Sequence, residues 1–329
     1  MTTPRRNRVD LHCHTERSDG VLPPLELYAQ MRRYGMRLVA ITDHDTLAGY
    51  RELHDAGVGA VPSPAGPQVL PGVEINTIGG ELLQAHGLGR EGEELHILGF
   101  GMDVADPAFN ATLARQREGR RQRILRTVER LRELGMPVDG VLDGGVAIDA
   151  LGRPHVARAL VRAGFADSVD DAFNRYLDHG QPGYVPRLGI GPREAIEAIV
   201  AAGGLAALAH SPGAPDRPEL MDDLQAWGLG GLEVYYRTFL PETVTRMRDF
   251  ARERGLLPTG GSDYHGDTMD YGEAQATAHV PDSVGEGLLA ALAEIGTRRA
   301  SAAEGVAVMG APSAAGGVAG AHAGPGSTP

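Results

Sequence analysis

Hydrophobic and polar positions fall into two kinds of segment along the chain: short apolar runs and amphipathic stretches with helical spacing. The apolar runs predict strands near Arg8–His14, Leu38–His44, Val69–Asn76, Glu94–Gly101, Leu205–Ser211, Gly231–Tyr236 and Leu256–His265. Helical spacing fits Pro24–Tyr34, Pro192–Ala202, Arg217–Trp227, Glu242–Arg254 and Gly285–Ile295. Because strands alternate with helices about seven times, we expect an α/β protein with a parallel sheet closed into a barrel.

One stretch departs from this alternation. Its pattern is helical throughout, over Phe109–Leu134, Arg153–Ala163 and Val169–Asp178. We therefore expect a first part of the barrel at 8–105, a helical insertion or cap at 106–188 and a second part of the barrel at 189–300. Residues 301–329 are rich in Ala, Gly, Ser and Pro, a composition typical of a disordered tail.

Composition narrows the functional classes. The 329 residues carry a net charge of -12, which argues against a stable nucleic-acid partner because phosphate contacts need a basic surface. No apolar run is long enough to span a bilayer, and the N-terminus lacks the apolar core of a signal peptide, so we expect a cytoplasmic protein without a membrane partner. The sequence contains no lysine, which excludes Schiff-base chemistry and a carbamylated-lysine metal bridge.

Ionisable side chains gather where the expected strands end. His12 and His14 are alternate residues and share one face of a strand, whereas Cys13 points to the other face. Comparable positions follow in Thr42-Asp43-His44, Glu74, His96, His210 and Asp263-Tyr264-His265. A single His-x-His pair is common by chance, but ionisable side chains at the ends of six successive strands are not expected by chance. Buried carboxylates need partners, and bound cations are the simplest ones here.

Longer motifs surround these residues. They are Ser18-Asp19-Gly20, the TDHDT of Thr42–Thr46, the PGVEI around Glu74, and the GGSDYHG of Gly260–Gly266. Together with His12 and His14, they resemble the PHP (polymerase and histidinol phosphatase) family of metal-dependent phosphoesterases. The segments at Glu93–Asp103, Gly152–Leu160, Ala172–Arg187 and Ala207–Ser211 are most similar to the branch that acts on nucleoside 3′,5′-bisphosphates and short 5′-phosphorylated RNA. The resemblance runs from about Val9 to Gly272.

The resemblance implies a distorted (β/α)7 TIM-like barrel with a helical insertion and two or three divalent metal ions. By position, it implies that one ion is held by His12, His14, Glu74 and Asp263, a second by Glu74, His96 and His210, and a third by Asp19, His44 and His265. Within this set, Glu74, His210 and Asp263 are the predicted catalytic residues. Mixed nitrogen and oxygen ligands suit Mn²⁺, Fe²⁺ or Zn²⁺, and the family favours Mn²⁺.

The predicted function is phosphate release from nucleoside 3′,5′-bisphosphates by a metal-activated hydroxide, with short 5′-phosphorylated RNA as a further candidate substrate. Arg153 and His155 in the GRPH motif, and Arg187 after GYVP, are the candidate substrate contacts, since guanidinium groups bind phosphate in a bidentate manner. The arginine-rich run Arg115–Arg132 invites an RNA-binding interpretation, but we favour a solvated helix face paired with glutamates.

Three alternatives stay open on the sequence alone. The same metal cage would serve a histidinol-phosphate phosphatase, which differs only in its substrate pocket. A non-catalytic module would be expected to lack ligands, and an amidohydrolase acting on C–N bonds is disfavoured by the absence of lysine. The sequence does not indicate an oligomeric state.

Overall fold

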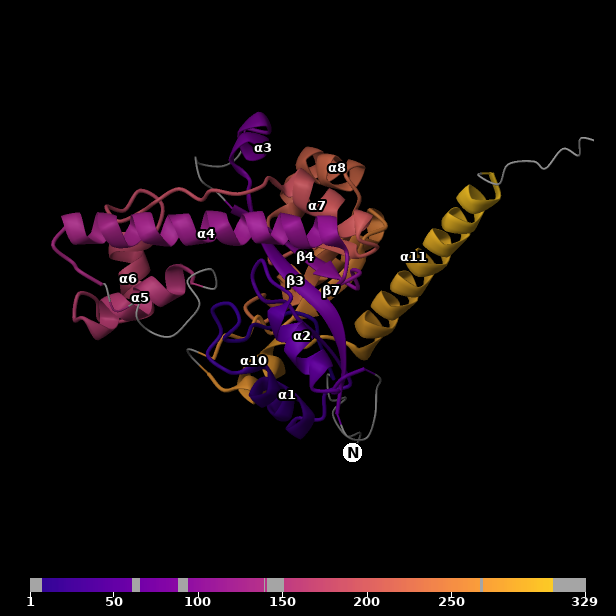
Figure 1. Cartoon of the computed structure of the whole chain (residues 1–329), viewed down its shortest axis with the longest axis horizontal. Coiled ribbons are helices and arrows are strands. Elements are labelled where there is room, and N and C mark those ends of the chain that lie inside the picture. The colour runs from indigo at the N-terminus through magenta and orange to yellow at the C-terminus, as the bar shows by residue number, and fades with distance from the viewer. Residues whose placement is uncertain are drawn as a thin grey trace, which may run out of the picture.

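The computed structural model describes residues 8–60, 66–87, 94–138, 140, 151–266 and 269–309, and in the last range it describes side chains as far as residue 301. One seven-stranded sheet runs in the order β1-β2-β3-β4-β5-β6-β7. The strands are β1 Val9–Asp10, β2 Leu38–Ile41, β3 Gln68–Ile78, β4 Glu94–Phe100, β5 Leu205–Leu208, β6 Leu229–Tyr236 and β7 Leu257–Gly261. The expected distorted seven-stranded barrel with flanking helices is confirmed (Figure 1).

The two ends of the sheet meet beyond the short strand β1. The backbone N–H of Leu11 donates to the carbonyl oxygen of Gly260 at 3.1 Å, and Cys13 forms a parallel bridge with Tyr264. Gly261 makes this approach feasible, because a Cβ there would lie 2.3 Å from the backbone nitrogen of His12. The closure places the segments that follow β1 and β7 side by side.

The expectation of an entirely parallel sheet is wrong for strand β4. It pairs antiparallel with both β3 and β5, whereas the other described pairings are parallel. In its described residues, the connection from β3 holds the short helix α3, Gly80–Ala85, which lies beyond the strand ends instead of crossing back along the sheet (Figure 1). The chain therefore returns into the barrel from the mouth, so the first residues of β4 lie beside the last residues of its neighbours.

Helices cover the outside of the barrel. The sequence predicted α1 Pro24–Arg33, α7 Pro192–Ala201, α8 Pro218–Ala226 and α9 Pro241–Glu253 to within about one residue at each end. It missed α2 Ala48–Asp55, α3, the 3-10 turn η3 Ala214–Asp216 and α10 Tyr271–Ala278. The missed helices have at most eight residues, too few for a clear helical period.

The interior of the barrel is apolar and is closed at one end by α11, Asp282–Met309. Val284 and Leu288 of α11 are buried against Val9, Leu38 and Leu205. The helix then runs outward from the barrel (Figure 1). It includes 301–309, the start of the segment expected to be a disordered tail, while 310–329 lie outside the described residues.

The insertion is built from α4 Pro107–Glu133, α5 Arg153–Arg162, α6 Val169–Ala172 and a π-helical turn, η2 Phe173–Leu177. These elements share their own apolar cluster, which includes Leu131, Val156, Leu160 and Leu177. Helix α4 is long enough to lie across the barrel with its first half and to carry α5 and α6 with its second half (Figure 1). Among the described residues, no helix combines the length and apolar character needed to cross a membrane.

Candidate metal centre

The first group of candidate ligands combines His12, His14, Glu74 and Asp263. As expected from strand alternation, His12 and His14 face the barrel mouth, while Cys13 is buried on the other side of the segment. Their Nε2 atoms both lie 3.2 Å from Oε2 of Glu74, and 3.3 and 3.2 Å from Oδ1 of Asp263. Four donor atoms therefore surround one point.

The second group consists of Glu74, His96 and His210. Oε1 of Glu74 lies 2.8 Å from Nδ1 of His96 and 3.0 Å from Nε2 of His210. His96 reaches this point because β4 is reversed, so that its third residue lies at the mouth. Glu74 thus offers one oxygen to each of two neighbouring groups.

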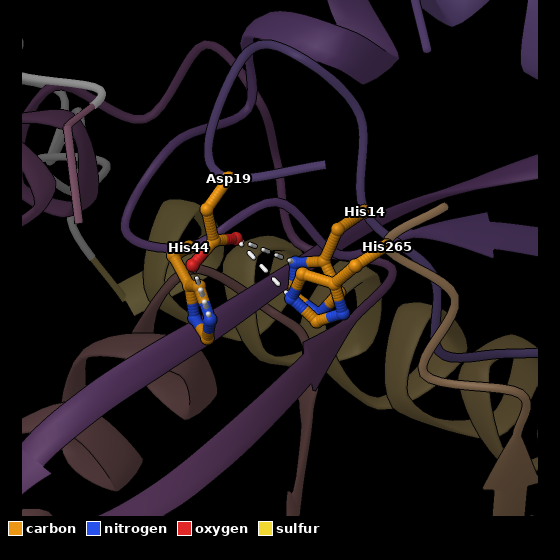
Figure 2. A group of neighbouring side chains, drawn as sticks. All are labelled: His14, Asp19, His44 and His265. Atoms are coloured by element: carbon orange, nitrogen blue, oxygen red, sulfur yellow. Dashed lines mark ion pairs between the residues drawn. The ribbon is translucent and has the colours of Figure 1, made fainter. Parts of the chain in front are cut away.

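The third group holds Asp19, His44 and His265, together with His14 (Figure 2). Oδ1 of Asp19 lies 3.3 Å from Nε2 of His265, and Oδ2 lies 3.6 Å from Nε2 of His44. The rings of His14 and His265 stack with centroids 4.2 Å apart. The structure therefore brings together all nine positions that the resemblance implied as ligands, and adds His14 as a side chain shared by two groups.

The donor set fits divalent cations. Several of its buried atoms have no hydrogen-bond partner among the described residues: Nε2 of His12, both ring nitrogens of His14, Oδ1 of Asp19, Nδ1 of His44 and Oε2 of Glu74. Buried polar atoms without partners are costly, and here they converge on the same points. Imidazole nitrogens and carboxylate oxygens in this mixture suit transition-metal ions.

Charge explains how the cage holds together without cations. Burial alone would raise the pKa of Glu74, but surrounding histidines such as His44, His12 and His96 hold it well below its usual range. Burial alone would lower the pKa of His14, but the adjacent carboxylates of Asp263 and Glu74 raise it to about 10. In the same way Glu74 raises the pKa of His96 to about 9 against the effect of burial. Metal binding must displace the protons on these rings.

Two residues outside the cage hold ligands in place, and neither was assigned a role from its sequence position. Glu233 of β6 is fully buried, with Oε1 2.9 Å from Nδ1 of His12 and Oε2 accepting a hydrogen bond from the backbone N–H of His210. A carboxylate on the far nitrogen of a ligating histidine fixes its tautomer and orientation. Tyr236, three residues further along β6, donates a hydrogen bond from its hydroxyl group to Oδ2 of Asp263 at 2.7 Å.

Backbone strain is concentrated at this mouth. Among the described residues, four that are not glycine have positive φ, and three of these are Asp45, His210 and Asp263, at 58°, 25° and 47°. Two are candidate ligands and the third follows His44 directly. Left-handed backbone costs energy for such residues and persists where the surroundings hold it, often at functional sites.

A cavity of about 260 Å³ opens above the cage between the barrel and the insertion. Seven of the nine candidate ligands line it, all except the deeper His12 and His14. The facing wall carries four arginines, Arg120 and Arg123 from α4, Arg153 from α5 and Arg187 from the segment after η2, together with Glu94 of β4. Nη2 of Arg123 and Nε of Arg187 are buried without a partner among the described residues.

The candidate substrate contacts do not share one environment. Arg153 lines the cavity, 3.6 Å from Oε1 of Glu94, and Arg187 lines it while paired with Asp45 at 2.8 Å. His155 is absent from the lining, and its Nδ1 accepts a hydrogen bond from the backbone N–H of Gly152 at the start of α5. Contact between these residues and substrate stays a prediction.

The arginine-rich run of α4 has two faces. Arg121, Arg130 and Arg132 are exposed and pair with Glu118, Glu133 and Glu129, as the solvated-face interpretation expected. That interpretation is wrong for Arg120 and Arg123, which are 4% and 3% exposed and point into the cavity wall. Helical spacing could have separated them, since buried positions recur along α4 at Gln116, Arg120, Arg123 and Thr127.

Asp45 joins the two walls. Its Oδ2 accepts hydrogen bonds from Arg120 of α4 and from Arg187, and its Oδ1 accepts one from the backbone N–H of Asn76 in β3. Burial alone would raise the pKa of Asp45, but Arg187 and Arg120 hold it below its usual value. This buried carboxylate therefore fixes the arginine wall to the segment that carries His44.

Three comparisons with known proteins agree with this geometry. The model of the PHP domain matches residues 10–146. A 5′-3′ exoribonuclease of Haemophilus influenzae is 33% identical over 268 residues, covering 78% of this chain and 90% of the relative. A 3′,5′-nucleoside bisphosphate phosphatase of Chromobacterium violaceum is 33% identical over 271 residues, covering 78% and 87%.

A solved structure extends the agreement to the fold. A metal-dependent phosphoesterase of Bifidobacterium adolescentis superposes with a TM-score of 0.70 at 33% identity, covering 86% of this chain and 95% of that one. The chain therefore belongs to the PHP-domain family and is a metal-dependent phosphoesterase, a hydrolase of phosphoric esters.

Proposed function

We propose that this phosphoesterase hydrolyses nucleoside 3′,5′-bisphosphates, with 5′-phosphorylated short RNA as a further substrate. One observation carries the proposal: the candidate metal cage and four arginines face the same cavity of about 260 Å³. A substrate with one phosphate at the cage and a second anionic group at the arginines matches both walls. The names of the two relatives support nucleotide or RNA substrates, so a histidinol-phosphate phosphatase is not favoured.

In this proposal the three groups of ligands hold two or three divalent ions, with Mn²⁺ the preferred ion. Bound ions supply positive charge for the phosphate and lower the pKa of an attacking water. Three carboxylates, Asp19, Glu74 and Asp263, leave three such ions with a surplus of positive charge. Glu74 acts as the bridge, because its two oxygens face different groups.

The chain's own residues prepare the cage for this role. Tyr236 binds Oδ2 of Asp263 and thereby leaves Oδ1 facing His12 and His14. Glu233 keeps the Nε2 atom of His12 pointing toward Glu74 and Asp263. Glu74, His210 and Asp263 line the cavity together with four other candidate ligands, and we propose that these three lie closest to the reacting phosphate.

The insertion, residues 106–188, serves in the proposal as a cap that selects the substrate, while 8–105 and 189–300 form the barrel. Its four arginines face two buried carboxylates, Asp45 and Glu94, which leaves two positive charges for the second phosphate. The unpartnered Nη2 of Arg123 and Nε of Arg187 supply donors for its oxygens. Contacts of this kind are local, so a stable nucleic-acid partner is not part of the proposal.

The test is phosphate release from adenosine 3′,5′-bisphosphate by the Mn²⁺-loaded protein. Treatment with EDTA, or His14→Ala, should abolish release because His14 belongs to two groups of ligands. The matched control is His54→Ala on α2, whose side chain is exposed, and which should keep full activity. Release that survives removal of metal, or faster hydrolysis of histidinol phosphate in parallel assays, would contradict the proposal.

A further inference from the structure

One corner of the cavity has a different chemistry from the remainder. Most of its described lining is ionisable or polar, and the apolar side chains in it are Ile124 of α4, Pro154 of α5 and Phe173 of η2, which we call the apolar patch. All three belong to the insertion, and each comes from a different element. Pro154 and Phe173 keep part of their surface exposed, unlike the buried residues of the cluster behind them. Ile124 is 1% exposed and belongs to that cluster, so Pro154 and Phe173 are the members of the patch that keep surface available beside the cavity.

A planar cation extends the patch. The guanidinium carbon of Arg153 lies 5.7 Å from the centre of the Phe173 ring, within the range of a cation–π contact. Arg153 is held from its other side by Glu94, 3.6 Å away. The ring and the guanidinium group are both flat, and both kinds of group stack with nucleobases in proteins.

The backbone at Phe173 is also unusual. Helix α6 changes there to the π-helical turn η2, and the backbone N–H of Asp178 donates to the carbonyl oxygen of Phe173 at 2.9 Å, five residues back. Such turns are rare and occur often at functional sites, where the extra residue redirects a side chain. Here the redirected turn begins with Phe173, the one aromatic side chain that the described residues of the insertion contribute to the lining of the cavity.

Neither a phosphate nor a sugar hydroxyl gains from contact with such a patch, whereas a flat aromatic ring does. We infer that Phe173 and Arg153, flanked by Pro154 and Ile124, form a stacking platform for the base of the substrate, which we term the insertion platform. This inference rests on the proposed function, and it identifies Phe173 as a specificity-determining residue.

The platform has a definite selectivity. Ile124, Pro154 and Phe173 have no side-chain donor or acceptor that could read the edge of a base, and stacking is tolerant of base identity. Adenosine, guanosine, cytidine and uridine 3′,5′-bisphosphates should therefore all be substrates, with purines bound somewhat better because they offer more area. A sugar bisphosphate without a base should bind markedly more weakly.

The experiment compares adenosine 3′,5′-bisphosphate with an abasic ribose 3,5-bisphosphate that carries hydrogen at C1′. For Phe173→Ala, KM for the nucleotide should rise about tenfold or more, while KM for the abasic compound changes less than about twofold. Phe173→Tyr should restore the wild-type value because it keeps the ring. Phe165→Leu is the matched control, since Phe165 packs on the same apolar cluster but does not line the cavity.

The outcomes separate this inference from the proposed function. Equal losses on both substrates, or equal KM values for both in the wild-type enzyme, would overturn the platform and leave the proposed function intact. If the wild-type enzyme released phosphate from neither compound, the proposed function would fail. The platform would then be tested by equilibrium binding. Adenosine 5′-monophosphate should bind about tenfold tighter or more than ribose 5-phosphate to the wild-type enzyme, and Phe173→Ala should lose this preference. Equal affinities of the two compounds for the wild-type enzyme would overturn the platform.

Discussion

The barrel and the insertion meet at one cavity, but they build their walls in different ways. On the barrel side, the candidate ligands stand on the strands or on the segments that follow them, and backbone hydrogen bonds fix the strands relative to one another. On the insertion side, the wall consists of long arginine side chains from α4, α5 and the segment after η2. These are held by buried ion pairs with Asp45 and Glu94.

This difference implies a division of work. Strand ends position short side chains within a few tenths of an ångström, which a metal cage requires. Guanidinium groups on long side chains suit the recognition of phosphates, which differ in position between substrates. We therefore expect substitutions in the barrel to affect the chemical step and those in the insertion to affect stability of the cap and choice of substrate.

The largest effect should follow Glu74→Gln. This carboxylate lies within 3.2 Å of ring nitrogens from five histidines, His12, His14, His44, His96 and His210. Loss of its charge should remove bound metal and lower the rate of phosphate release by about 10³-fold or more. Metal analysis and kinetics on the same sample measure both effects, with Glu118→Gln on the exposed face of α4 as the control. Normal metal content would show that the cage does not depend on its bridge.

Next in size should be Asp45→Asn, which tests how the insertion is attached. It leaves Arg120 and Arg187 buried without their countercharge, and breaking a buried ion pair costs about 3–5 kcal/mol. Urea denaturation should show this loss, with the insertion unfolding before the barrel. Asp171→Asn, at an exposed pair with Arg175, should leave the midpoint where it is. An unchanged midpoint for Asp45→Asn would mean that the two walls do not depend on this contact.

A smaller effect should follow Glu233→Gln, which keeps the shape of the side chain but removes the charge beside Nδ1 of His12. Partners of ligating histidines typically contribute about 10–100-fold to metal affinity. Competition with a chelator should measure that loss, while the melting temperature of the metal-free protein separates it from misfolding. Glu242→Gln, exposed on α9, is the matched control. Equal metal affinity in the two variants would show that Glu233 does not support metal binding through His12.

The mildest effect concerns pH and the metal-free protein. The folded-state pKa values of His14 and His96 are raised to about 10 and 9, above the ordinary 6.5. The stability that these protonated rings contribute is complete below pH 6.5 and is lost as the pH rises through 9 to 10. The melting temperature of the metal-free protein should therefore fall between pH 7 and 10, and that of the metal-loaded protein should fall less. A metal-free melting temperature that rises over this interval would refute the assignment.

Sequence reasoning reached the barrel side of the cavity because its signals are local. An apolar run followed by His-x-His or Asp-x-His is visible in a few residues, and strand alternation gives the direction of each side chain. The pairing of Glu74 with Asp263, 189 positions apart, follows once the strand ends share one mouth. The resemblance to a family then assigned the ligands to three groups.

The insertion side was less accessible because its signals depend on tertiary packing. Arg120 and Arg123 lie within a run of arginines, and although helical spacing marks their positions, it is the docking of α4 that buries them. Glu233 stands among apolar residues of β6, so its role depends on a histidine 221 positions away. The reversal of β4 depends on how the connection at 79–93 is routed, which helix and strand periodicity do not encode.

That reversal gives one strand an unusual position. Glu94 and His96 are alternate residues of β4, so both side chains extend from the same face of the strand, one toward Arg123 and the other toward Glu74. If the insertion were replaced, by recombination or by design, Glu94 is the strand residue whose contacts with the insertion would change first. Substituting Glu94 to match a different insertion therefore offers a route to new substrates while the candidate ligands of the barrel stay unchanged.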